Sequence, residues 1–318
     1  MANKGKMKLL GITPSAYVNR VQIALNLKRV GYEFVDENLA CKSDLLLKSN
    51  YKIIEPVTKD HRWYLHPLHY KSSSSSTHHP YNHHLSSMAK NGDIKLLGTA
   101  ASPYVNRVQF VLNLKSIEYE FIEENLARKS ELLLTSNPVH KKIPVLFHAN
   151  KPPICESLVI IEYLDEFLPD VHRILPLVPV DRANNRFWAN YVDNKYFPLY
   201  EELRQTPGKE GKEAIKKQII EGSMLLEETF EKFSNGKAYF GGDNVGYMDV
   251  ILGCFIAWIQ FTEKLNEFNA FDEVKTPKLA KWIERIQSHE SFKGAIPRNE
   301  TLMNFYMMLQ IHKPPRAT

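Results

Sequence analysis

The spacing of apolar residues changes character near residue 180. Before that point, from about residue 93, short apolar runs alternate with amphipathic segments, which is typical of strands and helices in alternation. The order is strand, helix, strand, then two strands and a helix, the thioredoxin-like arrangement. The spacing predicts strands at 95–98, 118–123 and 143–147, a further strand leading into the last helix, and helices at 102–116 and 157–167.

Beyond residue 180 the apolar residues recur at the spacing of helices throughout, which predicts an all-helical domain of about 140 residues. Asp249 follows Gly246 by three positions, so its carboxylate is expected to cap the helix that begins there. The predicted helices are 181–203, 212–233, 247–265, 277–287 and 301–311.

Residues 8–50 repeat residues 95–137 without a gap, and about 29 of the 43 aligned positions are identical. The first copy lacks the strands and helix that follow the second copy. Such a fragment buries too little apolar surface to be stable alone. We interpret it as a partial tandem duplication, or as a gene model that joins two neighbouring genes, with the fragment loosely ordered. The less favoured alternative is that residues 8–50 displace residues 95–137 from the sheet, as in domain swapping.

After residue 50 the two copies diverge, and residues 51–91 are rich in Ser and His without apolar periodicity. This composition predicts a disordered linker without a packed core. Its seven histidines between residues 61 and 84 invite a metal-site interpretation, but flexible His tracts bind metals weakly, so no metal is expected. The domain organisation is then 1–50, 51–91, 92–170 and 178–318.

Charge and cysteine content narrow the class of protein. The net charge is +5, but 36 acidic residues are interspersed with the basic ones, which argues against a nucleic-acid-binding surface. Three cysteines without close spacing suggest neither a disulfide framework nor zinc. No signal peptide or membrane span is evident, so a cytoplasmic location is expected.

Three motifs and their spacing give a specific resemblance. They are Ser-Pro-Tyr-Val-Asn-Arg at 102–107, Asn-Pro-Val-His-Lys-Lys-Ile-Pro-Val at 137–145 and Cys-Glu-Ser at 155–157. Together with Arg-Phe-Trp-Ala at 186–189 and Phe-Gly-Gly-Asp at 240–243, they resemble the plant tau class of glutathione S-transferases over about 225 residues. The resemblance implies the cytosolic glutathione transferase fold, a thioredoxin-like domain followed by a helical one.

Ser102 is the expected catalytic residue. Ser followed by Pro103 is typical of a helix N-terminus, so Ser102 is at least a cap. At the positive end of the helix dipole, its hydroxyl can also donate to a thiolate and lower the pKa of a thiol from about 8.5 towards neutrality. The resemblance implies that this thiol is that of glutathione. No His–acid pair accompanies Ser102, which argues against nucleophilic catalysis by the serine itself.

The resemblance also implies where glutathione binds. Pro144 is expected in a cis peptide bond that leaves the backbone of Ile143 free for the cysteinyl part; the alternative is an ordinary proline at a strand start. Glu156 and Ser157 open a helix and are expected to hold the γ-glutamyl end, although they too have a simpler interpretation as helix caps. Lys129 and Lys142 match lysines near the glycyl carboxylate.

A second pocket, for an apolar electrophile, is implied between the two domains. Residues 99–101 are small where the family commonly has an aromatic residue, which enlarges this pocket and leaves substrate preference open. Aromatic residues at helical spacing are more often simply core. The resemblance places Tyr104, Arg107, Leu126, Phe197 and Trp258 in its wall.

The expected function is conjugation of glutathione to hydrophobic electrophiles by a homodimer without a cofactor, with peroxide reduction as a side activity. A non-catalytic carrier of glutathione or apolar ligands is the alternative. A thiol transferase or dehydroascorbate reductase is disfavoured, because those relatives have Cys where this chain has Ser102.

Overall fold

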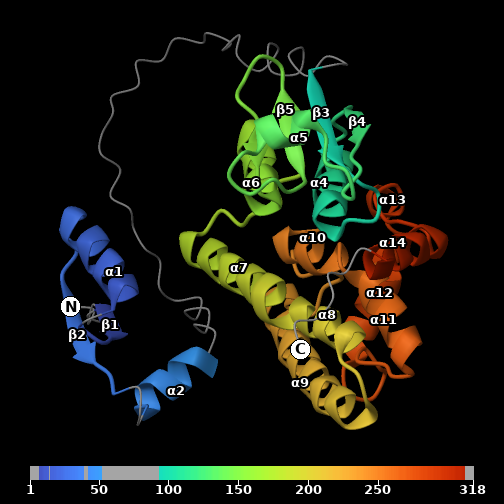
Figure 1. Cartoon of the computed structure of the whole chain (residues 1–318). Helices are drawn as coiled ribbons and strands as arrows, with labels where there is room; N and C mark the ends of the chain where they lie inside the picture. The colour runs from blue at the N-terminus through green and yellow to red at the C-terminus, as the bar shows by residue number, and fades with distance from the viewer. Residues whose placement is uncertain (1–6, 14, 39–41, 52–92, 312–318) are drawn as a thin grey trace, which may run out of the picture. The chain divides into compact units, whose positions relative to one another are not determined.

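The computed structural model describes residues 7–13, 15–38, 42–51 and 93–311, which fall into two separate units (Figure 1). The predicted linker 51–91 lies almost wholly outside the described residues. The first unit is a two-stranded parallel sheet with a helix between the strands and a second helix after them. Its elements are β1 (Met7–Gly11), α1 (Ala16–Leu27), β2 (Tyr32–Asp36) and α2 (Asp44–Tyr51).

The α/β part of the second unit is a four-stranded mixed sheet with strand order β4-β3-β5-β6. β3 pairs with β4 in parallel and with β5 antiparallel, and β6 pairs antiparallel with β5. The elements are β3 (Ile94–Gly98), α4 (Pro103–Leu114), β4 (Glu120–Glu123), α5 (Glu131–Ser136), β5 (Val145–His148), β6 (Ile154–Cys155) and α6 (Ser157–Phe167).

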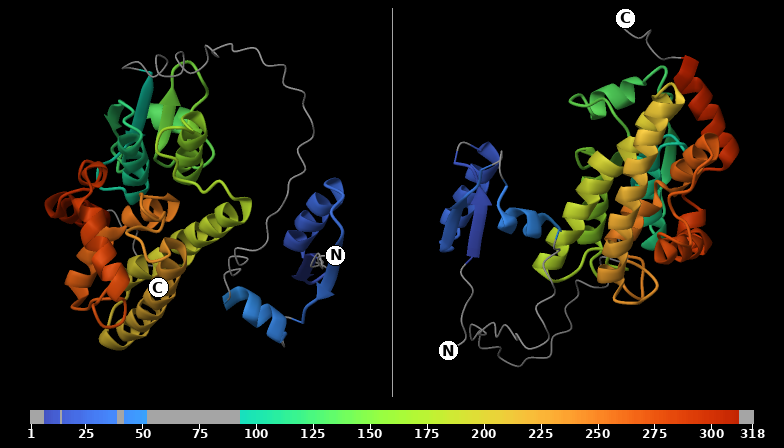
Figure 2. Two further views of the ribbon diagram at one scale, coloured as in Figure 1. Left: turned by 180° about the vertical axis from the view of Figure 1, so that it is seen from behind. Right: turned by 90° about the horizontal axis from the view of Figure 1, so that it is seen from below.

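Both faces of this sheet are covered. Leu97 and Val145 pack with Leu133 of α5 on one face, and all three are essentially buried. Because successive strand residues point to opposite faces, Leu96 and Leu146 face the other side, where α4 and α6 contact each other (Figure 2). The predicted thioredoxin-like order is confirmed; α5 was missed, since six residues carry too little periodicity to distinguish a helix from a loop.

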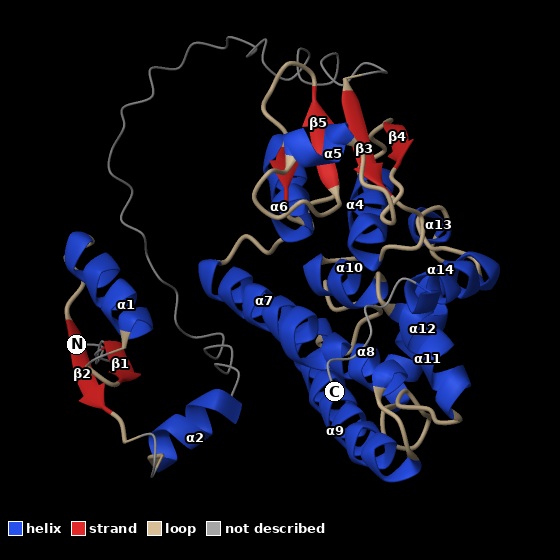
Figure 3. Cartoon of the chain, in the orientation of Figure 1, coloured by secondary structure: helices blue, strands red, loops and turns tan. Residues whose placement is uncertain are grey.

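Among the described residues, the rest of the second unit consists of helices and loops, with one isolated β-bridge between Tyr239 and Gly242 (Figure 3). They confirm the predicted all-helical domain. None of the described helices is both long and apolar enough to cross a membrane. They are α7 (Pro179–Tyr191), the π-helical turn η1 (Val192–Tyr196), α8 (Phe197–Gln205), α9 (Lys209–Ser234), α10 (Tyr247–Gly253), α11 (Ile256–Asn266), α12 (Pro277–Ser288), α13 (Glu290–Lys293) and α14 (Asn299–Ile311).

Two predicted helices are wrong as single elements. The helix expected at 181–203 is divided by the π-helical turn η1, and the one expected at 247–265 is interrupted at residues 254–255. Apolar spacing does not report such interruptions, because the side chains on both sides still face the core. The expected cap at Asp249 is confirmed: its carboxylate accepts from the backbone N–H groups of Phe240, Gly241 and Gly246.

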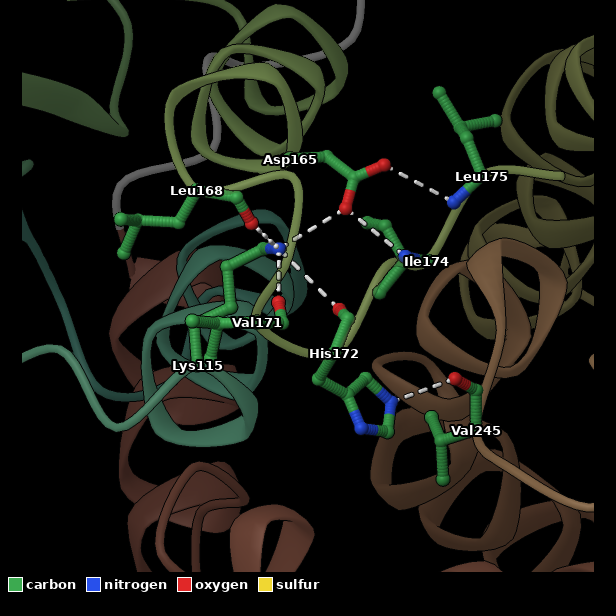
Figure 4. A network of polar contacts seen from close by, with 8 residues as sticks. All are labelled: Lys115, Asp165, Leu168, Val171, His172, Ile174, Leu175 and Val245. Atoms are coloured by element: carbon green, nitrogen blue, oxygen red, sulfur yellow. Dashed lines mark hydrogen bonds and ion pairs between the residues drawn. The ribbon is translucent and has the colours of Figure 1, made fainter. Parts of the chain in front are cut away.

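A buried lysine ties the two parts of the second unit together (Figure 4). The ammonium of Lys115, at the C-terminus of α4, donates to the carbonyls of Leu168, Val171 and His172 and lies 3.0 Å from Asp165 Oδ1 of α6. Burial lowers the pKa of Lys115. The ring of His172 in turn donates to a carbonyl that precedes α10, that of Val245. This network orders the chain between α6 and α7.

Candidate functional site

Ser102 lies at the N-terminus of α4 and on the wall of a cavity. Its backbone is extended, as expected for a residue just before a helix, and Pro103 occupies the first turn. The hydroxyl oxygen is 3.4 Å from the backbone N–H of Val105, from which it accepts. Ser102 is therefore a helix cap that also borders open space.

The cavity has a volume of about 280 Å³ and lies between the α/β part and the helical part of the second unit. The α/β part contributes Ser102 and its neighbours and Leu126, while α8, α11 and α14 supply the rest. Its walls are mainly aromatic and apolar, with a few charged groups. The lining residues are Ser102, Pro103, Tyr104, Leu126, Phe197, Glu201, Arg204, Gln205, Trp258, Phe305 and Tyr306.

Trp258 connects the helical part directly to the loop that ends at Ser102. Its indole N–H donates to the carbonyl of Ala101 over 2.8 Å, and the side chain is almost fully buried. Tyr104 and Phe197 both contact the ring of Phe255, the first edge-to-face and the second stacked at 3.9 Å between centroids. These contacts join the residues on both sides of Ser102 to the helical part.

Arg107 does not lie where it was expected. It is absent from the cavity wall and is fully buried, with its guanidinium 2.6 Å from Asp193 Oδ1. It also donates to Ser157 Oγ over 2.9 Å. The physical reason is the π-helical turn η1, which carries Asp193 and which the sequence pattern did not reveal. Arg107 thus links the N-terminus of α6 to the helical part.

The residues expected at the glutathione site lie where strands and helices of the α/β part begin or end. The Ile143–Pro144 peptide bond is cis, as predicted. Glu156 has a φ of +71°, a conformation that costs energy for a residue with a Cβ and that is common at binding sites. Its carboxylate is exposed, whereas Ser157 beside it is buried and begins α6.

The two lysines are exposed. Lys129 donates to the backbone carbonyl of Lys141 over 2.8 Å, which brings it next to Lys142 in the segment before Ile143. This arrangement places positive charge at the same edge of the sheet as the cis-proline. His140, in the same segment, lies 4.0 Å from Glu156.

Sequence reasoning missed several residues of the cavity. Glu201, Arg204 and Gln205 follow Phe197 by four, seven and eight positions, so they share its face of α8, and that spacing would have identified them. Phe305 and Tyr306 left no such signal, because their position depends on how α14 packs. Among the described residues, no group of His, Cys, Asp or Glu is arranged to hold a metal; the histidine-rich segment lies outside them.

Comparison with protein families agrees with this architecture. A family model described as "Glutathione S-transferase, N-terminal domain" matches residues 96–170, and one described as "Glutathione S-transferase, C-terminal domain" matches 187–290. "Glutathione S-transferase U17" of Arabidopsis thaliana is 47% identical over 214 residues, 67% of this chain and 94% of that protein. "Glutathione S-transferase U16" of the same plant is 43% identical over 73% of this chain and 99% of its own length.

Solved structures give the same result. The crystal structure of a tau class glutathione S-transferase from mango, Mangifera indica, has a TM-score of 0.67 and 47% identity, covering 69% of this chain and 99% of the mango chain. A rice glutathione transferase solved in complex with glutathione has a TM-score of 0.62 and 34% identity, covering 70% of this chain and all of the rice chain.

Proposed function

The chain belongs to the tau class of the glutathione S-transferase family and is a glutathione transferase; from this premise we propose that Ser102 stabilises the thiolate of bound glutathione. The observation that carries the proposal is that Ser102 both begins α4 and borders the cavity. Its hydroxyl accepts from Val105 N–H, so the hydroxyl proton is available for a sulfur in the cavity. Donation to the thiolate, together with the helix dipole, lowers the pKa of the thiol.

We assign the glutathione arms to the sheet edge beside Ser102. The backbone of Ile143, before the cis-Pro144, is suited to pair with the cysteinyl part. The exposed carboxylate of Glu156 suits the ammonium of the γ-glutamyl end, and the hydroxyl of Ser157 suits its carboxylate. Arg107 orients that hydroxyl through its 2.9 Å hydrogen bond. Lys129 and Lys142 then attract the glycyl carboxylate.

The cavity is the proposed site of the electrophile, with Tyr104, Leu126, Phe197 and Trp258 in its wall. Arg107 is removed from that set and supports the glutathione side instead. The thiolate attacks the electrophilic carbon and the leaving group departs with its electron pair, so proximity and thiolate stabilisation carry the rate. Peroxide reduction, in which two glutathiones become a disulfide while the peroxide yields alcohol and water, is the proposed side activity.

The full-length protein provides the test. We expect conjugation of glutathione to 1-chloro-2,4-dinitrobenzene by the wild type, a strong loss in Ser102→Ala, and no loss in Ser15→Ala, which removes the equivalent cap of α1. Retained glutathione binding without turnover by the wild type would favour the carrier function. An unchanged conjugation rate in Ser102→Ala would show that Ser102 acts only as a helix cap.

We propose that the protein acts as a homodimer in the cytoplasm. Exposed apolar side chains on α5, α6 and α7 support the dimer: they include Leu132, Leu134, Val159, Val180 and Phe187. A surface of this kind is typical of interfaces between subunits. Sedimentation analysis of the wild type and Phe187→Ser tests the assembly, and a monomeric wild type would refute it.

We further propose that residues 1–50 are a partial duplicate of the thioredoxin-like domain at 92–170, joined by the linker 51–91, and that 178–318 form the helical domain. The matching order of elements in the two copies supports a duplication. A chain beginning at Lys90 is expected to keep full transferase activity. Loss of activity in that chain would show that the first copy contributes to the enzyme.

A further inference from the structure

Among the described residues that line the cavity, one carries a positive charge for which the general transferase reaction has no use. Arg204 of α8 borders it, and its guanidinium lies 5.0 Å from the ring centroid of Trp258. Arg204 Nη1 also donates to Thr262 Oγ1 over 2.5 Å. The Thr262 hydroxyl in turn donates to the carbonyl of Trp258. An arginine is thus fixed in place on the cavity wall by two uncharged partners.

Arg204 is incompletely compensated in charge. Among the described residues, no carboxylate forms an ion pair with it within 4.0 Å. Arg204 is half-buried, and burial lowers its pKa. A guanidinium offers five N–H donors in a planar fork that matches a carboxylate. A partly desolvated arginine held by neutral groups therefore favours an anion from the ligand.

Glu201, one turn before Arg204 on α8, is the acidic residue among the described residues that line the cavity. Glu201 is partly exposed, and burial raises the pKa of its carboxyl. Arg204 attracts it without contact, so Glu201 competes weakly with an anionic ligand. Tyr306 of α14 also lines the cavity.

The relative positions of Arg204 and Ser102 in the cavity wall indicate which kind of ligand the cavity accommodates. Arg204 follows Phe197 by seven residues, which is about 10 Å along a helix axis. Phe197 stacks on Phe255, which also contacts Tyr104 two residues from Ser102. Trp258 donates to the carbonyl of Ala101 beside Ser102 and also lies against the Arg204 guanidinium, so the cation shares an aromatic cavity wall with the thiolate position.

We propose that this cavity selects apolar electrophiles that carry a carboxylate, and that Arg204 binds that carboxylate. The proposal rests on the proposed function, because it names the substrate class of the same site. The aromatic wall holds the body of the substrate while the carboxylate–guanidinium pair orients its reactive carbon towards the glutathione sulfur. Arg204 is then a specificity-determining residue.

A matched pair of substrates tests the proposal on the full-length protein. The probes are 4-chloro-3,5-dinitrobenzoate and its methyl ester, which differ by the negative charge. In both, the carbon–sulfur bond forms and the carbon–chlorine bond breaks with loss of chloride. The measured quantity is kcat/KM for the acid divided by kcat/KM for the ester, each corrected for its uncatalysed rate.

We expect Arg204→Gln to lower this ratio about tenfold, mainly through a higher KM for the acid, because the lost contact is a charge-assisted one. Arg204→Lys should keep part of the ratio, and Glu201→Gln should raise it about twofold. Arg186→Gln is the control, since it removes an exposed arginine that pairs with Glu162 outside the cavity. Equal loss for both substrates in Arg204→Gln would overturn the proposal.

A binding measurement tests the role of Arg204 if the protein does not turn over these substrates. Tryptophan fluorescence, with Trp258 in the cavity wall, reports binding of unreactive 3,5-dinitrobenzoate and its methyl ester. Preferential binding of the acid, lost in Arg204→Gln, would support the proposal even if neither chlorinated substrate reacted and the proposed function failed. Equal binding of acid and ester by the wild type would overturn it while leaving the transferase activity intact.

Discussion

Residues 8–50 and 95–137 are nearly the same sequence in two different environments, and their local structures agree. In each copy a serine accepts from a backbone N–H three residues on, at 3.4 Å, to begin the first helix. In each copy a glutamate after the second strand accepts from the serine that precedes the next helix: Glu37 from Ser43 and Glu124 from Ser130.

The tertiary environments of the two copies differ completely. α1 has no buried residue, whereas α4 has nine among its twelve. Leu27 is 79% exposed and its twin Leu114 is 9% exposed. Lys28 is exposed, and its twin Lys115 is buried in the network of Figure 4. Helix capping and strand pairing are therefore encoded locally. Burial of the helix side chains requires β5, β6, α6 and the helical part, which follow the second copy.

The largest expected difference concerns the twin lysines. Lys115→Met leaves Asp165 as an uncompensated buried charge, so we expect it to lower the free energy of unfolding by about 3–5 kcal/mol. Lys28→Met should change it by less than about 0.5 kcal/mol, as for other surface substitutions. Urea unfolding followed by tryptophan fluorescence measures both. Similar values for the two variants would mean that the Figure 4 network contributes nothing to stability.

The twin leucines sharpen the comparison for apolar burial. Leu114→Ala is expected to cost about 2–4 kcal/mol, because it removes methyl groups from a packed core and leaves a cavity. Leu27→Ala, at an exposed position, should be nearly neutral in the same urea experiment. A substantial loss in Leu27→Ala would reveal a partner surface that covers α1.

Ser102 and its counterpart Ser15 allow the function of the two helix N-termini to be compared. Ser102→Ala is expected to lower kcat for 1-chloro-2,4-dinitrobenzene about 100-fold, equivalent to about 2.7 kcal/mol of transition-state stabilisation. The pH profile of the variant should shift upward, since the glutathione thiol regains its ordinary pKa. Stopped-flow spectroscopy of the bound thiolate measures that pKa directly. An unshifted profile would contradict the role of Ser102.

The smallest effect concerns residue 16, where the first copy has Ala and the second has Pro103. Ala16 is the first residue of α1, a position where proline is favoured. Ala16→Pro is expected to stabilise α1 by about 0.4–1 kcal/mol, by restricting the unfolded chain. Hydrogen exchange of the α1 amides measures this. A loss of protection would indicate that the backbone there differs from that of its twin.

The sequence by itself determined most of the helices and strands and their order along the chain. Apolar spacing identified the sheet strands and most helices, and the Ser-Pro and Glu-Ser pairs marked the helix N-termini where Ser102 and Ser157 lie. These features depend on neighbours within a few residues, which a single sequence displays. The sequence match between residues 8–50 and 95–137 and the resemblance to the glutathione transferase family were recognisable for the same reason.

Only the tertiary structure decided which side chains face the cavity. Arg107 was assigned to its wall, but an ion pair with Asp193, 86 residues away, buries it elsewhere. Arg204 and Tyr306 come together with Ser102 only because α8, α11 and α14 pack against the N-terminus of α4. Such contacts join residues that are far apart in the chain. Helical periodicity predicts which face of a helix is apolar, but it does not predict which residues pack against that face.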